Sequence, residues 1–121
     1  MPDTGGSFFL PRLVGVARAT ALMFLGDKIP ATKALEWGMI YDLVPAPALL
    51  DRATALARQL AAMPTRALGL IKRAMNASYA NDINAQLALE ETLQGEAGRT
   101  SDYAEGVAAF LEKRKPSYTG R

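Results

Sequence analysis

Apolar residues recur at helical spacing along almost all of this chain, and no other feature of the sequence restricts its fold as strongly. The clearest case lies between about residues 48 and 62. There Leu49, Ala53, Leu56 and Leu60 share one helix face, and charged residues lie mostly off it. The same spacing predicts further helices over about 7–15, 16–25, 30–38, 65–79, 82–98 and 101–115. We therefore expect a mainly α-helical chain.

Residues that favour helix ends stand at the borders of these stretches. Gly26 and Gly38 suit the left-handed conformation that closes many helices. Either member of the pairs 81–82 and 100–101 can cap the helix that follows it. Asp102 suits the positive N-terminal end of the last helix, and the basic residues 113–115 suit its C-terminal end.

The segment MIYDLVP carries the only strand pattern, with Ile40, Tyr41, Leu43 and Val44 ahead of Pro45. We expect one short strand here. A single strand has no hydrogen-bonding partner within this sequence, and an unpaired edge is a liability. Either the segment packs irregularly, or its partner strands belong to chain outside these 121 residues.

The composition excludes several kinds of chemistry. The 121 residues contain no cysteine and no histidine, which removes disulfides, thiol nucleophiles, Ser-His-Asp triads and nearly all zinc sites. We expect no metal site. Acid–base chemistry must then use carboxylates, tyrosine, lysine or water.

Charge and hydropathy argue against nucleic-acid and membrane partners. The chain has 14 basic and 12 acidic side chains, a net charge of +2, and its basic residues are scattered except for 113–115. No apolar run approaches the roughly 20 residues of a membrane span. The first residues do not read as a signal peptide. We expect a cytoplasmic protein, with which the lack of cysteine is compatible.

Three stretches carry a resemblance to a known family: PDTGGSFFLPRLVG, GDKIPATKALEWGMIYDLVP and EGVAAFLEKRKPSYTG. In this order and spacing they resemble the C-terminal half of the crotonase (enoyl-CoA hydratase/isomerase) superfamily, over essentially the whole chain. Within the superfamily, ALEWGMI and LGLIKRAMNAS are most similar to the branch that isomerises 1,2-epoxyphenylacetyl-CoA.

The resemblance implies an architecture and a partner set. Residues 1–46 would be the end of the crotonase core, and residues 47–121 a C-terminal helical region for trimerisation. The family's N-terminal half, with its β-turn spiral, both oxyanion-hole N–H groups and the two glutamates of hydratases, would lie outside this chain. The resemblance also implies a homotrimer or hexamer. It implies an acyl-CoA substrate and no separate cofactor, because the substrate is carried as a coenzyme A thioester.

Asp3 is the candidate catalytic residue. In hydratases of this family the matching turn has a small residue at this position, whereas dienoyl-CoA and epoxyphenylacetyl-CoA isomerases have an aspartate that moves protons. The resemblance therefore implies that Asp3 is the acid/base. From spacing alone, the alternative is that Asp3 caps the helix beginning near Ser7.

Four further residues are candidate binding residues. Gly5 and Gly6 would let the backbone approach the acyl group closely, or would simply form a turn. In the family the positions of Phe110 and Lys113 contact the adenine and the phosphates of coenzyme A, often across a subunit boundary. The alternatives are that Phe110 belongs to the core, which its spacing from Tyr103 favours, and that Lys113 only complements the helix dipole.

Three functions remain open from the sequence. The first is part of an acyl-CoA isomerase that works by proton shuttling, the second is part of an enoyl-CoA hydratase, and the third is a non-catalytic helical oligomerisation protein. We expect the 121 residues alone to be inactive, because the oxyanion hole would lie outside them.

Overall fold

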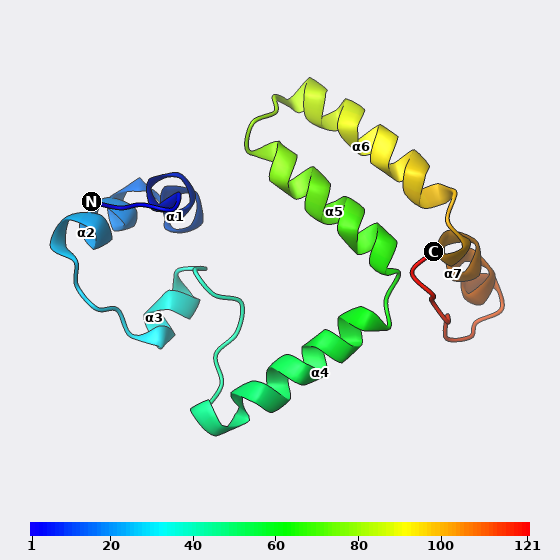
Figure 1. Cartoon of the computed structure of the whole chain (residues 1–121), viewed down its shortest axis with the longest axis horizontal. Coiled ribbons are helices and arrows are strands. Elements are labelled where there is room, and N and C mark those ends of the chain that lie inside the picture. The colour runs from blue at the N-terminus through cyan, green and yellow to red at the C-terminus, as the bar shows by residue number, and fades with distance from the viewer. The chain divides into compact units, whose positions relative to one another are not determined.

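The computed structural model describes residues 1–121 and consists of helices joined by loops (Figure 1). It confirms a mainly α-helical chain. The α-helices are α1 Gly6–Val14, α2 Val16–Leu25, α3 Ala31–Glu36, α4 Leu49–Ala61, α5 Thr65–Ser78, α6 Ile83–Gly98 and α7 Ser101–Leu111, and a single turn of 3-10 helix covers Ala46–Ala48.

The predicted strand is wrong. Residues 39–45 form bends and open loop, and the chain has no strand anywhere. The Met39 N–H bonds back to the carbonyl of Ala34, and the Leu43 N–H bonds to the carboxylate of Asp42. A strand needs a neighbour to accept its ladder of hydrogen bonds. With no neighbouring strand in the chain, these two N–H groups bond locally instead.

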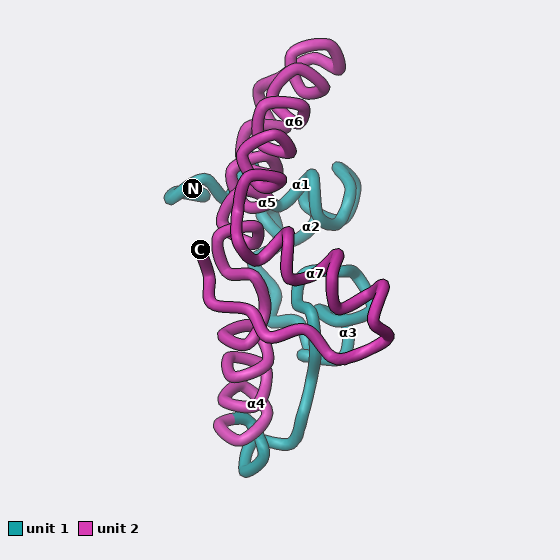
Figure 2. The backbone as a smooth tube through the Cα atoms, turned by 90° about the vertical axis from the view of Figure 1, so that its right-hand side faces the viewer, with its two compact units in different colours: residues 1–49 teal, residues 50–121 magenta.

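The chain divides into two compact units, residues 1–49 and 50–121, each described here by itself (Figure 2). In the first unit α1 packs against α2, and Val14 and Ala19 are its buried side chains. Gly15 joins the two helices with φ of 83°, a value that an L side chain rarely adopts, so glycine allows the sharp turn.

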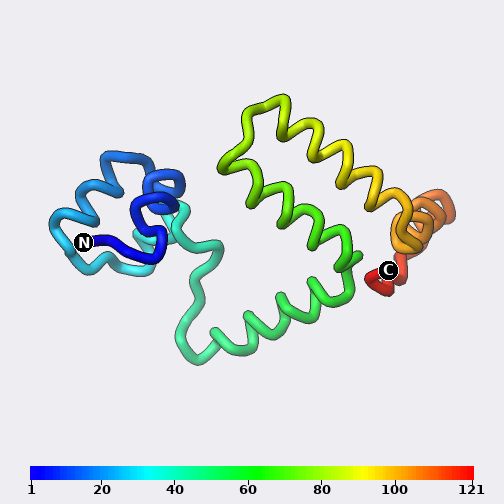
Figure 3. The backbone as a smooth tube through the Cα atoms, turned by 45° about the horizontal axis from the view of Figure 1, so that its top comes forward, coloured from blue at the N-terminus to red at the C-terminus, as the bar shows by residue number.

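The second unit is built on an antiparallel pair of helices, α5 and α6, which lie side by side (Figure 3). Leu70 of α5 and Leu93 of α6 are buried between them. Asp82 caps α6 by accepting the Ala85 N–H, and Thr100 caps α7 by accepting the Tyr103 N–H. Asp82 and Thr100 are two of the four residues that were predicted as candidate caps from the sequence.

Few apolar side chains in either unit are buried. The buried apolar residues are Val14, Ala19, Leu70, Leu93 and Ala109, and Asp102 is the one buried charged residue. Large exposed apolar side chains occur along α4 and along the α5–α6 pair, including Leu50, Leu60, Ile71, Met75, Ile83 and Leu87. The amphipathic faces are therefore formed, but most of their area stays open to solvent.

Candidate functional site

Asp3 lies in the tight turn that leads into α1, and its side chain is exposed. Its carbonyl accepts the Gly6 N–H at 2.8 Å, and its carboxylate accepts the Thr4 hydroxyl at 3.2 Å. Gly5 is the N-cap residue of α1, and no side chain caps this helix. The alternative role of Asp3 as a helix cap is therefore wrong, and its carboxylate is available for other work.

Gly5 is explained by the local backbone. Its φ is 84°, and a Cβ there would come within 2.9 Å of the Phe9 ring. Phe9 in turn packs edge-on against Phe8 at 5.1 Å between ring centres. Gly6 already belongs to α1 and has ordinary space around it. The turn thus brings Gly5 and Gly6 next to Asp3, while contact of either glycine with a substrate stays a prediction.

Lys113 lies just beyond α7 and has φ of 55°, the left-handed conformation that glycine or asparagine usually takes at this place. The Arg114 N–H bonds to the carbonyl of Ala109, and the Lys113 N–H bonds to that of Phe110, which closes the helix end. The side chain of Lys113 is exposed. A lysine held in this conformation costs free energy that a glycine would not.

Phe110 is 82% exposed, so its predicted place in the core is wrong. Phe110 is one of the residues that line an open hollow of about 390 Å³ between the start of α5, the end of α6 and α7. The other lining residues include Tyr103, Val107, Leu111 and Tyr118. α7 does have an apolar stripe, but its side chains Tyr103, Val107 and Phe110 stay largely exposed within this chain. Phe110 and Lys113 thus lie at the same end of one helix, and their contact with coenzyme A stays a prediction.

Two acidic residues of α7 have a role that the sequence did not reveal. Asp102 and Glu105 hold the segment after the helix against its side. The Arg114 guanidinium and the Ser117 N–H, both hydrogen-bonded to Glu105, lower its pKa from 4.5 to about 2. Two features of the sequence could have indicated this arrangement: Gly106 within a helix, and Thr119-Gly120 shortly after Pro116.

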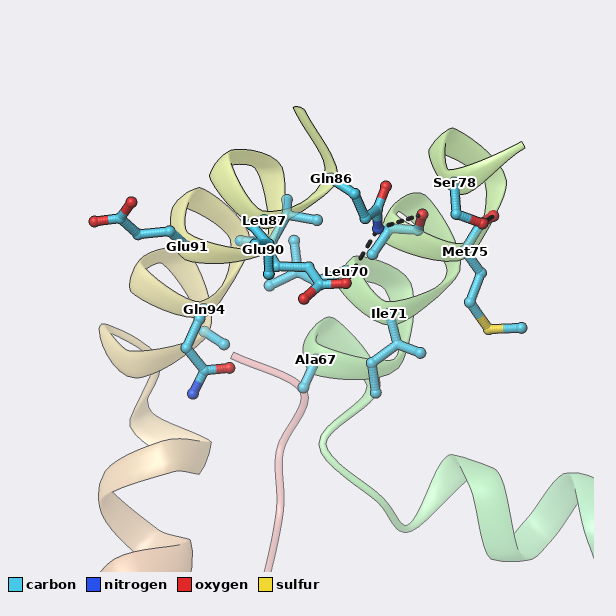
Figure 4. Close-up of a pocket in the computed structure, with 13 residues that line it drawn as sticks. Ala67, Leu70, Ile71, Met75, Ser78, Gln86, Leu87, Glu90, Glu91 and Gln94 are labelled. Atoms are coloured by element: carbon cyan, nitrogen blue, oxygen red, sulfur yellow. Dashed lines mark hydrogen bonds between the residues drawn. The ribbon is translucent and has the colours of Figure 1, made fainter. Parts of the chain in front are cut away.

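A second hollow, of about 840 Å³, runs between α5 and α6 (Figure 4). Leu70 and Leu93, both buried, line it, and the Gln86 amide of α6 joins the helices by donating to the Ala74 carbonyl of α5 at 3.2 Å. The same amide also donates to Glu90, one turn further along α6. The carboxylates of the neighbouring residues Glu90 and Glu91 point in different directions in Figure 4. This hollow, which we call the groove, therefore offers apolar surface but no two carboxylates that face each other for acid–base chemistry.

The whole chain, residues 1–121, matches the family model described as enoyl-CoA hydratase/isomerase. The chain belongs to this family. Its turn at Asp3 and its α7 end are therefore parts of a family of acyl-CoA enzymes, and the predicted resemblance is confirmed.

Curated relatives agree with this family over the full chain. The 1,2-epoxyphenylacetyl-CoA isomerase of Escherichia coli (strain K12) is 50% identical over 121 residues, which are 100% of this chain and 46% of the relative. The 2,3-dehydroadipyl-CoA hydratase of the same organism is 36% identical, over 100% of this chain and 48% of the relative. This family member thus spans less than half the length of both proteins.

Solved structures give the same result. An enoyl-CoA hydratase from Geobacillus kaustophilus HTA426 superposes with a TM-score of 0.93 at 36% identity, over 98% of this chain and 45% of that one. The enoyl-CoA hydratase from Bacillus anthracis superposes with a TM-score of 0.92 at 36% identity, over 100% of this chain and 47% of that one. This family member therefore has the C-terminal helical part of the crotonase fold. None of its helices combines the length and the apolar character needed to cross a membrane.

Proposed function

We propose that this chain supplies the proton-transfer carboxylate and part of the coenzyme A contacts of an acyl-CoA isomerase whose substrate is an epoxyphenylacetyl-CoA or an enoyl-CoA. The observation that carries the proposal is the exposed carboxylate of Asp3, which lies in the turn with two glycines, accepts only the Thr4 hydroxyl and does not cap α1. The 50% identity to an isomerase with a named substrate of this class supports it.

The chemistry needs one carboxylate that can take a proton from one atom of the substrate and return it to another. Enolisation of the thioester places negative charge on its carbonyl oxygen, which backbone N–H groups stabilise in an oxyanion hole. Asp3 would act as the general base and then as the general acid. No cofactor takes part, because the activating group is the coenzyme A thioester.

Lys113 would bind the phosphates of coenzyme A, with Phe110 near the adenine. Its left-handed backbone supports this role, because a lysine stands where glycine would be more stable. An ammonium beside a phosphate makes a charge-assisted hydrogen bond.

We also propose that residues 47–121 are the region through which the protein assembles into a homotrimer or hexamer. Ile71, Met75, Ile83 and Leu87 are exposed by 55%, 64%, 69% and 55% along α5 and α6, and soluble proteins seldom leave such a row uncovered. Residues 1–46 would then complete the active site of the core. A cytoplasmic location is consistent with an acyl-CoA substrate and a chain without cysteine.

A hydratase is the second candidate, because the chain is also 36% identical to a 2,3-dehydroadipyl-CoA hydratase and superposes on enoyl-CoA hydratases. Hydratases of this family use two glutamates from the half that this chain does not match. In a hydratase, removal of the Asp3 carboxylate should therefore leave most of the activity.

The test is a chimera in which residues 1–121 replace the matching part of the E. coli isomerase. We expect the chimera to isomerise 1,2-epoxyphenylacetyl-CoA, and Asp3→Asn to lower kcat by about 10²–10⁴ while KM changes little. Asp27→Asn, another exposed aspartate of the first unit, is the matched control and should keep full activity. Wild-type kcat in Asp3→Asn would overturn the isomerase proposal.

A further inference from the structure

The segment after α7 folds back along the helix and is held at its far end by Asp102. We call residues 116–121 the tail. Asp102 is only 3% exposed, although it is charged. One of its carboxylate oxygens accepts the Thr119 N–H at 2.7 Å and the Thr119 hydroxyl at 3.3 Å, and the other accepts the Gly120 N–H at 2.7 Å. The buried carboxylate is therefore fully engaged by the tail.

Further contacts hold the tail along the same helix. Glu105 accepts the Ser117 N–H at 2.8 Å and two Arg114 N–H groups at 2.6 and 2.9 Å. Gly106 gives the Tyr118 ring room, because a Cβ there would come within 3.2 Å of the Tyr118 hydroxyl. Asp102 is about one helical turn from Glu105 and Gly106, so all three lie on one side of α7. The tail thus runs back along that side.

Lys113 lies in the short connection between the end of α7 and the tail. Only four residues separate the end of α7 from the tail, and the chain must reverse direction within them. The left-handed backbone of Lys113 makes the reversal, at a cost that a free chain would relieve by relaxing. Because a buried carboxylate is expensive to leave unpaired, the tail and Asp102 hold this conformation in place.

We propose that Asp102 is a positioning residue for substrate binding. By anchoring the tail, it keeps Lys113 in one backbone conformation and presents the ammonium group to the phosphates of the acyl-CoA in one direction. This inference rests on the proposed function of Lys113. It adds that a residue at the opposite end of α7, which itself touches no substrate, sets the affinity for coenzyme A thioesters.

The first experiment measures the anchor on the 121-residue chain by limited trypsin digestion, with the cleavage sites read by mass spectrometry. Trypsin cuts after Lys113 and Arg114 only if this connection can open. We expect Asp102→Asn to speed these cuts by about tenfold, because the amide cannot accept both backbone N–H groups. Asp51→Asn is the matched control: Asp51 is also an aspartate in the first turn of a helix, but it is exposed, and its variant should be cut at the wild-type rate.

A second variant leaves Asp102 unchanged. Gly120 has φ of 80°, and a Cβ there would collide with the Thr65 hydroxyl oxygen. Gly120→Ala should therefore displace the tail and also speed the cuts after Lys113 and Arg114. Wild-type cleavage rates in both Asp102→Asn and Gly120→Ala would overturn the anchor.

The second experiment measures binding in the chimera with the E. coli isomerase. We expect Asp102→Asn to raise KM for the acyl-CoA by about five- to tenfold, with kcat within about twofold of wild type. KM for the matching pantetheine thioester, which lacks the nucleotide phosphates, should not change. A general loss of structure would alter both substrates alike.

The outcomes separate the two proposals. If Lys113→Ala raises KM for the acyl-CoA and Asp102→Asn does not, the positioning role is overturned and the phosphate contact stands. If Lys113→Ala leaves KM unchanged, the phosphate contact fails and the positioning role fails with it, whatever the digestion shows about the anchor.

Discussion

The backbone angle of Lys113 predicts a change in stability that is independent of the charge of its side chain. Its φ of 55° favours glycine, so Lys113→Gly should raise the free energy of unfolding by about 0.5–1 kcal/mol, after allowance for the greater freedom of glycine in the unfolded chain. Urea unfolding followed by circular dichroism would measure this. Lys113→Ala is the matched control, because it removes the charge and keeps the strain. If the Lys113→Gly variant is no more stable than the Lys113→Ala variant, the prediction is wrong.

Glu105 gives a pH dependence with a defined direction. Its pKa falls from 4.5 to about 2 because Arg114 and the Ser117 N–H stabilise the charged form. A carboxyl group with a lowered folded-state pKa adds stability above its unfolded pKa and loses it as the pH falls to the folded value. We therefore expect the hold on the tail to weaken between about pH 4.5 and pH 2.

Carboxyl chemical shifts measured by NMR would test this prediction directly. The Glu105 carboxyl should titrate near pH 2, well below that of a solvated glutamate. In Arg114→Gln the pKa of the same carboxyl should rise towards its ordinary value, because the guanidinium that lowers it most is gone and only the Ser117 N–H remains. An unchanged midpoint in that variant would show that Arg114 does not lower the pKa.

At the scale of single residues, the sequence predicted candidates better than it predicted their surroundings. Asp3 could be singled out because the family resemblance implies an acid/base aspartate at its position, but whether its carboxylate caps α1 depended on turn geometry. Phe110 was misplaced for a different reason. Its spacing marks one face of α7, and periodicity cannot say whether another element covers that face.

The α5–α6 pair is the element whose packing can be tested most simply. Leu93 is 4% exposed between the two helices, whereas Leu87, on the same helix, is 55% exposed. We expect Leu93→Ala to lower the free energy of unfolding by about 2–3 kcal/mol, near the low end for a core leucine, because the groove is open on one side. Leu87→Ala should cost less than about 1 kcal/mol. Equal losses in urea unfolding would mean that Leu93 is not the packing residue.

Helices were predictable as elements because each one is specified within its own residues. The Leu49–Ala61 helix lies within one residue of the range expected from its apolar spacing, and Gly26 and Asp82 stand at ends where their conformations are needed. The strand prediction failed because a strand needs hydrogen-bonding partners from another segment. Ile40, Tyr41 and Val44 have suitable side chains, but their backbone found no neighbour with which to pair.

At the scale of the whole molecule, the chain matches less than half the length of its relatives. The chain spans 46% of the E. coli isomerase, and the resemblance assigns the oxyanion hole to the part that it does not match. Loss of even one oxyanion-hole donor costs about 10²–10³ in rate. The 121-residue chain alone should therefore turn over 1,2-epoxyphenylacetyl-CoA at less than about 1% of the chimera's rate, measured under the same conditions. Comparable rates would mean that the chain holds a complete site.

The exposed apolar row on α5 and α6 predicts that the chain associates with itself. Burial of apolar area is worth about 25 cal/mol per Å², so several such side chains covered together can hold copies in contact. We expect sedimentation velocity at micromolar concentrations to show oligomers. The double variant Ile71→Gln, Leu87→Gln should shift the chain towards the monomer without unfolding it, because both side chains are already exposed. Met63→Gln, an exposed apolar residue between α4 and α5 outside the groove, is the control and should not shift it. If the wild-type chain is a monomer throughout, this face does not mediate self-association.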